Sequence, residues 1–194
     1  MQSIKRPKDP GPLIPAYAAA IDAAGMVICS WHTAPRVLEH LGWTGRSVRQ
    51  VVGWQDPAAA AADFPPLPRQ LPVHVERAND REHPEAEGAP TLDQVRRLLD
   101  AARPAEPGLL MVCCHAAVAR STATALAIMV ARHGAGEADL LVERILALRP
   151  GAAPNRLILR HAEAVLGIRG EALLAAVRRS PTMQENLMRP DPLD

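Results

Sequence analysis

The sequence predicts an α/β fold, with a short, mostly parallel sheet of about four strands flanked by helices. Short apolar runs alternate along the chain with longer segments in which apolar residues recur at helical spacing. Such alternation is typical of parallel sheets, because the connection between two parallel strands usually contains a helix. With 194 residues, of which 48% are hydrophobic, the chain is long enough for one domain with a single core.

Four short apolar runs are predicted as strands, and the last is the most apolar of them. It has the sequence LLMVC, without a polar residue, which is typical of a strand that is buried on both faces. We therefore expect this strand at the centre of the sheet. The predicted strands are Met26–Ser30, Val48–Trp54, Val73–Arg77 and Leu109–Cys113.

The helices are predicted from capping residues and from apolar residues that recur three or four positions apart. Thr91-Leu-Asp-Gln94 matches a capping box, in which the Thr and Gln side chains each accept a hydrogen bond from the other residue's backbone N–H. Residues 120–133 are apolar on nearly every side, which predicts a buried helix. Helices are expected over 33–41, 91–102, 120–133, 137–149, 154–166 and 171–179.

The two ends of the chain differ in composition from the rest. Residues 1–15 are polar and rich in proline, which predicts a flexible arm. Residues 180–194 are also polar and contain three prolines, and they are predicted to be a disordered tail. Residues 16–179 are therefore expected to form the folded domain.

Charge and hydropathy exclude several classes of protein. The chain has 22 Lys and Arg residues against 21 Asp and Glu residues, so it lacks the basic excess of a nucleic-acid-binding protein. No run of about 18 apolar residues predicts a membrane span, and the polar start does not resemble a signal peptide. We therefore expect a cytoplasmic protein without nucleic-acid or membrane partners.

The segment that carries chemistry follows the fourth predicted strand, with the sequence Cys114-His-Ala-Ala-Val-Ala-Arg120-Ser121. A turn of this length between a strand and a helix can direct backbone N–H groups toward one point, beside the positive end of the helix dipole. The thiolate form of a cysteine is favoured at such an anion site, and the planar fork of arginine matches two phosphate oxygens. The pattern predicts hydrolysis of a phosphate ester through a phosphocysteine, without a metal or cofactor.

Cys114 to Ser121 has the form Cys-x5-Arg-Ser, which is the signature of the cysteine-dependent protein tyrosine phosphatase superfamily. The surrounding sequence LLMVCCHAAVARSTATALAI resembles small bacterial tyrosine phosphatases of the dual-specificity-like kind. The similarity covers residues 91–168 and includes Pro-Asn-Arg at 154–156. It implies a phosphatase-like domain over 16–179 that acts on a phosphorylated protein or a small phosphomonoester.

The resemblance also implies a role for each residue of the motif. Cys114 would be the nucleophile, Arg120 would bind the phosphoryl oxygens, and Ser121 would donate a hydrogen bond to the departing sulfur. Asn155 would hold the loop or orient water. The implied phosphate-binding residues are His115, Ala116, Ala117, Val118, Ala119, Arg120 and Asn155.

Phosphatases of this kind also use an aspartic acid in a loop before the helix that precedes the catalytic strand. This residue protonates the leaving oxygen and then activates water. Asp80 lies in the matching loop, residues 78–90, and is the expected general acid. Glu82 and Asp63 are the alternatives.

Two residues depart from the family pattern. Cys113 stands where relatives have a histidine, and Ala117 stands where relatives have a glycine. If the backbone at Ala117 needs a positive φ, alanine costs roughly 1–2 kcal/mol there. These departures leave open a catalytically weak or dead phosphate-binding pseudophosphatase. A rhodanese-like sulfurtransferase is a further alternative, against which Ser121 and Asn155 argue.

The chain has three cysteines. Cys29 and Cys113 are expected to be small apolar residues of the core, with Cys113 turned away from Cys114 by strand alternation. The alternatives are a disulfide between Cys113 and Cys114, or a contact between Cys29 and Cys114 that protects the thiol during oxidation.

Overall fold

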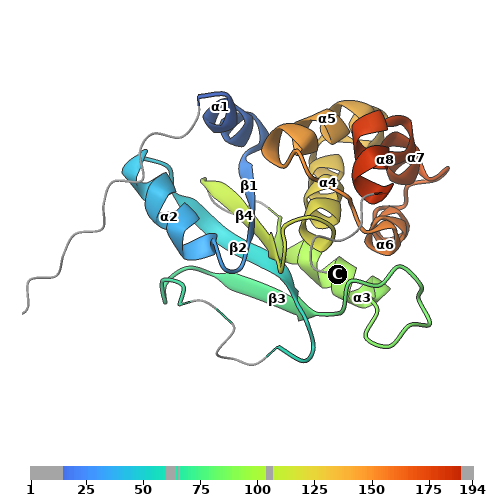
Figure 1. Cartoon of the computed structure of the whole chain (residues 1–194), viewed down its shortest axis with the longest axis horizontal. Helices are drawn as coiled ribbons and strands as arrows, with labels where there is room; N and C mark the ends of the chain where they lie inside the picture. Colours follow the sequence, from blue (N-terminus) through green and yellow to red (C-terminus); the bar gives the residue numbers. More distant parts are fainter. Residues whose placement is uncertain (1–14, 60–63, 65, 104–106, 189–194) are drawn as a thin grey trace, which may run out of the picture.

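Four parallel strands form one sheet in the order β1–β4–β2–β3 (Figure 1). The computed structural model describes residues 15–59, 64, 66–103 and 107–188. The prediction of an α/β fold with a parallel sheet of about four strands is confirmed. The strands are β1 (Met26–Ser30), β2 (Val48–Gln55), β3 (Val73–Arg77) and β4 (Leu109–Cys114).

β4 lies at the centre of the sheet, as its apolar sequence predicted, and all six of its residues are buried. It pairs with β1 on one side and β2 on the other, so that Cys113 lies opposite both Cys29 and Gly53. A Cβ atom on Gly53 would lie only 2.3 Å from the carbonyl oxygen of Cys113. Glycine therefore allows β2 to approach β4 closely at the edge of the sheet where the site lies.

Helices cover both faces of the sheet (Figure 1). α2 lies on one side, while α4 packs on the other against β1, β2 and β4. α5 and α6 pack against α4, and α7 packs against both. The helices are α1 (Pro15–Ala24), α2 (Ala34–Trp43), α3 (Leu92–Ala101), α4 (Arg120–His133), α5 (Ala138–Leu148), α6 (Arg156–Leu166), α7 (Ala172–Arg179) and α8 (Pro181–Met188), with a 3₁₀ turn η2 (Ala135–Glu137).

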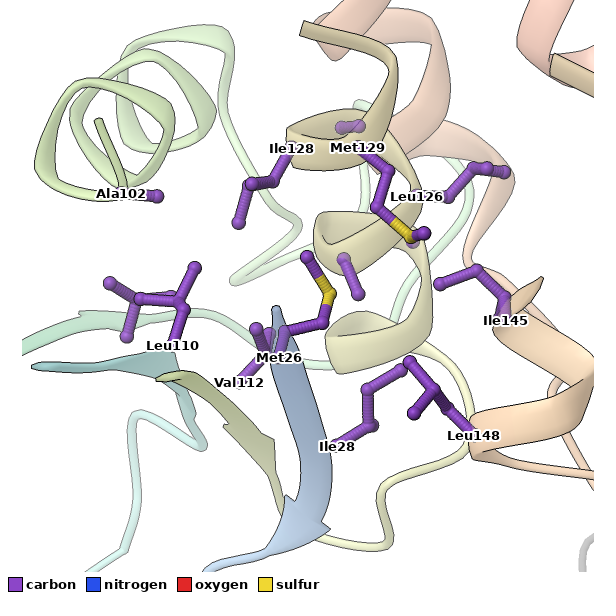
Figure 2. Close-up of a cluster of buried hydrophobic side chains, with 14 of the residues drawn as sticks. Met26, Ile28, Ala102, Leu110, Val112, Leu126, Ile128, Met129, Ile145 and Leu148 are labelled. Carbon is purple, nitrogen blue, oxygen red and sulfur yellow. The ribbon is translucent and has the colours of Figure 1, made fainter. Parts of the chain in front are cut away.

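The buried helix α4 is the centre of the core. Every residue from Arg120 through Val130 is buried, because α4 has the sheet on one side and other helices around it. Figure 2 shows side chains of β1 and β4 meeting those of α4 and α5, and Ala102, which directly follows α3 (Leu92–Ala101), beside them. The hydroxyl group of Thr124 has hydrogen-bond partners inside this core, because it donates to the carbonyl of Arg120 and accepts from Trp54 Nε1 at 2.8 Å. The packing fixes the N-terminus of α4, which borders the candidate site.

Local sequence signals placed most of the elements correctly. The capping box at Thr91 is present, with Gln94 as its second member. β3 and α4 have the bounds that the sequence predicted, and β2 and β4 are each one residue longer. No helix in the described part of the chain is long and apolar enough to cross a membrane.

Two helices were not predicted. α1 has the sequence PAYAAAIDAA, in which alanine favours a helix but gives little contrast between an apolar and a polar face. It is held by packing against β1 and α5. α8 occupies residues 181–188, where a disordered tail was expected, and its Met183 is fully buried. That expectation is corrected for these residues, while residues 1–14 and 189–194 lie outside the described part.

Candidate active site

The site begins where β4 ends. Cys114 is the last residue of β4, and its backbone carbonyl accepts a hydrogen bond from the N–H of Trp31, which follows β1. The Cys114 side chain is only 2% exposed, and its Sγ lies 3.1 Å from Oγ of Ser121, a buried residue in the first turn of α4. The strand and the helix therefore bring a thiol and a hydroxyl together across a loop of five residues, 115–119.

The carbonyl groups of this loop are held from outside by the segment 149–155. The Arg149 side chain donates to two of them, at 3.0 and 3.1 Å, and the backbone N–H groups of Ala153 and Asn155 donate to two more, at 3.0 and 3.3 Å. The accepting carbonyls belong to Ala116, Ala117, Val118 and Ala119. This role of Arg149 was not expected from the sequence.

The N–H groups of the loop have no such partners. Among the residues that the structure describes, no acceptor is found for the backbone N–H groups of residues 115–119. A peptide N–H points away from the carbonyl of the preceding residue, so carbonyls held on the outside leave the N–H groups directed inward. Unpaired N–H groups gathered at a helix N-terminus form a site for an anion.

Ala117 has a φ of 59°, in the left-handed region, and is almost fully buried. The positive φ that would make alanine costly at this position is therefore present, and alanine adopts it at a cost of roughly 1–2 kcal/mol. Arg149 helps to hold this conformation, because its Nε donates to the carbonyl of Ala117.

Arg120, the first residue of α4, is buried, with only 3% of its surface exposed. Its Nη1 donates to Oδ1 of Asp56 at 2.7 Å and to the carbonyl of Ala78. Its Nε is buried and has no hydrogen-bond partner in the described structure, and it lies 3.9 Å from Oδ2 of Asp80. A buried donor without an acceptor is costly, so this nitrogen is available to an anionic ligand.

Asp80 lies in the loop after β3, and Asn155 Nδ2 donates to its Oδ1 at 2.7 Å. Its side chain keeps 42% of its surface exposed, but the protein around it removes enough solvent to raise its pKa above the ordinary value. The hydrogen bond from Asn155 and the charge of Arg120 lower the pKa and offset this effect only in part. Asn155 also begins α6, because its Oδ1 accepts the N–H of Ile158.

Glu82, the first alternative to Asp80, has a different environment. Its carboxylate accepts from the backbone N–H of Arg156 at 3.0 Å and from Arg156 Nε at 2.6 Å. Burial would raise the pKa of Glu82, but the hydrogen bonds and charge of Arg156 outweigh it and lower the pKa. Glu82 thus attaches the loop to the start of α6. Asp63, the second alternative, lies outside the described residues.

Two residues named in the sequence analysis, His115 and Cys113, flank Cys114 in the chain. The His115 side chain is exposed and contacts His32 edge to face, with ring centroids 5.3 Å apart. Cys113 lies on the face of β4 opposite to Cys114, and its Sγ is 3.5 Å from Sγ of Cys29. All three cysteines are free thiols, and the close pair is Cys29–Cys113, which neither alternative had named.

Asp56 is, after Arg149, a second residue of the site that the sequence analysis missed. It follows β2 directly, at the same edge of the sheet as Cys114. The sequence signal that could have identified Asp56 is its position at the carboxyl end of a parallel strand that lies beside β4. Within the described part of the chain, no three His, Cys, Asp or Glu side chains are placed to hold a metal ion.

Solved structures with a similar fold include those of DUSP28 and DUSP15. The crystal structure of human DUSP28 gives a TM-score of 0.53 at 19% sequence identity, covering 78% of this chain and 95% of that one. The crystal structure of DUSP15 gives a TM-score of 0.50 at 19% identity, covering 82% and 94%. The chain therefore has the fold of dual-specificity phosphatases. A scan of protein-family models and a search of curated proteins found no match.

Proposed function

We propose that this protein is a cysteine-dependent phosphatase that hydrolyses phosphotyrosine or another phosphomonoester through a phosphocysteine intermediate. One observation carries the proposal: the buried Arg120, whose Nε has no partner among the described residues, ends a loop of unpaired N–H groups that starts at Cys114. These donors suit a dianionic phosphoryl group. The similar fold of dual-specificity phosphatases supports the same class of reaction.

In the first step, the Cys114 thiolate attacks phosphorus, so that an S–P bond forms and the ester O–P bond breaks. Arg120 and the loop N–H groups bind the phosphoryl oxygens as their charge develops. Asp80 donates its proton to the leaving oxygen. A carboxyl group with a raised pKa keeps this proton over a wider pH range than an ordinary aspartic acid does.

In the second step, water attacks the phosphocysteine, the S–P bond breaks, and inorganic phosphate is released. Asp80, now ionised, accepts a proton from this water. Ser121 donates a hydrogen bond to the departing thiolate, which is consistent with the 3.1 Å distance between its Oγ and Sγ of Cys114. None of these roles involves a metal or a cofactor.

The test is hydrolysis of p-nitrophenyl phosphate by the purified full chain between pH 5 and pH 8. We expect turnover that vanadate inhibits and that Cys114→Ser abolishes. Cys29→Ala is the matched control, because Cys29 is also buried but lies on the other face of the sheet.

Two results would contradict the proposal. Vanadate binding without turnover would indicate the phosphate-binding pseudophosphatase, and transfer of sulfur from thiosulfate to cyanide would indicate a sulfurtransferase. The comparisons favour neither alternative.

A further inference from the structure

We propose that Asp56 is a positioning residue for Arg120, which holds one edge of the guanidinium group so that the other edge binds the phosphoryl group. This inference deepens the proposed phosphatase function and rests on it. It starts from the hydrogen bond of 2.7 Å between Arg120 Nη1 and Asp56 Oδ1.

The partners of Arg120 are divided between the two edges of the guanidinium group. Nη1 is occupied by Asp56 and by the carbonyl of Ala78, whereas Nε is buried and has no partner among the described residues. An arginine binds two oxygens of a phosphate through two parallel N–H groups. The edge formed by Nε and Nη2 is the one that can provide them, because Nη1 is taken.

Asp56 is itself fixed by the residues around it. It directly follows β2, and Arg77 at the end of β3 donates to the carbonyls of Pro57 and Ala59. A Cβ atom on Gly88 would lie 3.6 Å from Pro57, so the segment after Asp56 packs against the loop that contains Asp80. A carboxylate held in this way can restrain a long side chain that otherwise has several rotamers.

The two carboxylates beside Arg120 therefore differ in their contacts. Asp56 makes a direct charge-assisted hydrogen bond with the arginine, and Asp80 lies 3.9 Å from it and bonds to Asn155 instead. A carboxylate that is hydrogen-bonded to the arginine can influence how the arginine binds the phosphoryl group. A carboxylate that makes no hydrogen bond with the arginine can exchange a proton with the substrate. Asp56 fits the first task.

The experiment measures inhibition by vanadate and kinetics with p-nitrophenyl phosphate for Asp56→Ala and Asp56→Asn in the full chain. For Asp56→Ala we expect vanadate affinity and kcat/KM to fall by about 10-fold or more, because a hydrogen bond between charged groups is lost. Asp56→Asn keeps an acceptor for Nη1 and should recover a large part of the loss. The pH–rate profile should keep its descending limb, moved slightly to lower pH, because Asp80 is unchanged and the charge of Asp56 is the weaker of the two charges that raise its pKa.

Two further variants separate positioning from general destabilisation. In an Arg120→Ala background, Asp56→Ala should have little additional effect on kcat/KM, because Asp56 acts through Arg120. Asp139→Ala is the matched control, because it removes an aspartate that forms an exposed ion pair with Arg179. It should leave vanadate affinity unchanged.

The outcomes distinguish this inference from the proposed function. A wild-type chain that hydrolyses the substrate, together with an Asp56→Ala variant of equal vanadate affinity, would overturn the role of Asp56 and leave the phosphatase standing. Additive losses in the double variant would also overturn it. A wild-type chain that neither binds vanadate nor turns over substrate would overturn both.

Discussion

The adjacent residues Cys113 and Cys114 have opposite environments, although both are buried at the end of the same strand. Cys114 lies next to a serine hydroxyl at the start of α4 and to a loop whose N–H groups have no acceptor among the described residues. Cys113 lies 3.5 Å from the thiol of Cys29, and burial raises its pKa well above the ordinary value. The comparison shows that strand alternation alone can separate a candidate nucleophile from a structural thiol.

The largest difference is expected from replacing each of these cysteines in turn by serine. Cys114→Ser should reduce turnover by about 10⁴-fold or more, because the hydroxyl is a far weaker nucleophile, and leave the melting temperature nearly unchanged. Cys113→Ser should keep most of the activity but lower the free energy of unfolding by about 1–3 kcal/mol, because it buries a hydroxyl without a good partner. Kinetics and thermal unfolding measure the two effects, and equal loss of activity in both variants would break the comparison.

Asp80→Asn tests whether Asp80 is the general acid that acts together with Cys114. Loss of a general acid should lower kcat by about 10²–10⁴-fold. The proposed reaction needs Asp80 protonated, so wild-type activity should fall as the pH rises through the raised pKa of this group. The variant should lose this descending limb, which a pH–rate profile measures. Glu82→Gln is the control, and a variant profile identical to wild type would exclude Asp80.

The same raised pKa has a consequence for stability. In the folded state Asp80 binds its proton more tightly than in the unfolded chain, so its contribution to stability falls as the pH rises through the two pKa values. Asp80→Asn should therefore be more stable than wild type at neutral pH and lose this advantage in acid. Chemical denaturation at both pH values measures the difference, and an advantage that grows in acid would contradict it.

Arg149→Ala removes the outer support of the loop. The carbonyls of Ala116 and Ala117 would lose two charge-assisted hydrogen bonds, so we expect kcat/KM and vanadate affinity to fall by about 10-fold. Arg178→Ala, which removes a surface ion pair with Glu171, is the matched control. If the two variants behave alike, Arg149 has no part in shaping the loop.

The smallest effect is expected from Ala117→Gly. Glycine adopts the positive φ of this position without strain, so the free energy of unfolding should rise by about 1 kcal/mol. Ala119→Gly is a control in the same loop, where φ is −106° and glycine should not stabilise the protein. Thermal unfolding of both variants measures the difference, and a lower melting temperature for Ala117→Gly would show that the strain is absent.

The sequence by itself determined the elements that depend on local signals. Strand β4 follows from an unbroken apolar run, α3 from its capping box, and α4 from an apolar segment that ends at a glycine. The candidate residues Cys114, Arg120 and Ser121 were also local, because their spacing spans one strand–loop–helix turn. Their roles, and that of Asp80, stay predictions that the variants above test.

Only the tertiary structure decided how distant segments meet. The contacts of Arg120 with Asp56 and of Asp80 with Asn155 each join residues more than 60 positions apart, and no local periodicity encodes them. The pairing of Cys29 with Cys113 depends on the strand order, which places β1 beside β4. α1 and α8 form because packing stabilises short helices that their own sequences do not define. Side-chain and packing interactions of this kind act across the folded chain, so they become visible only once the sheet order and the helix positions are known.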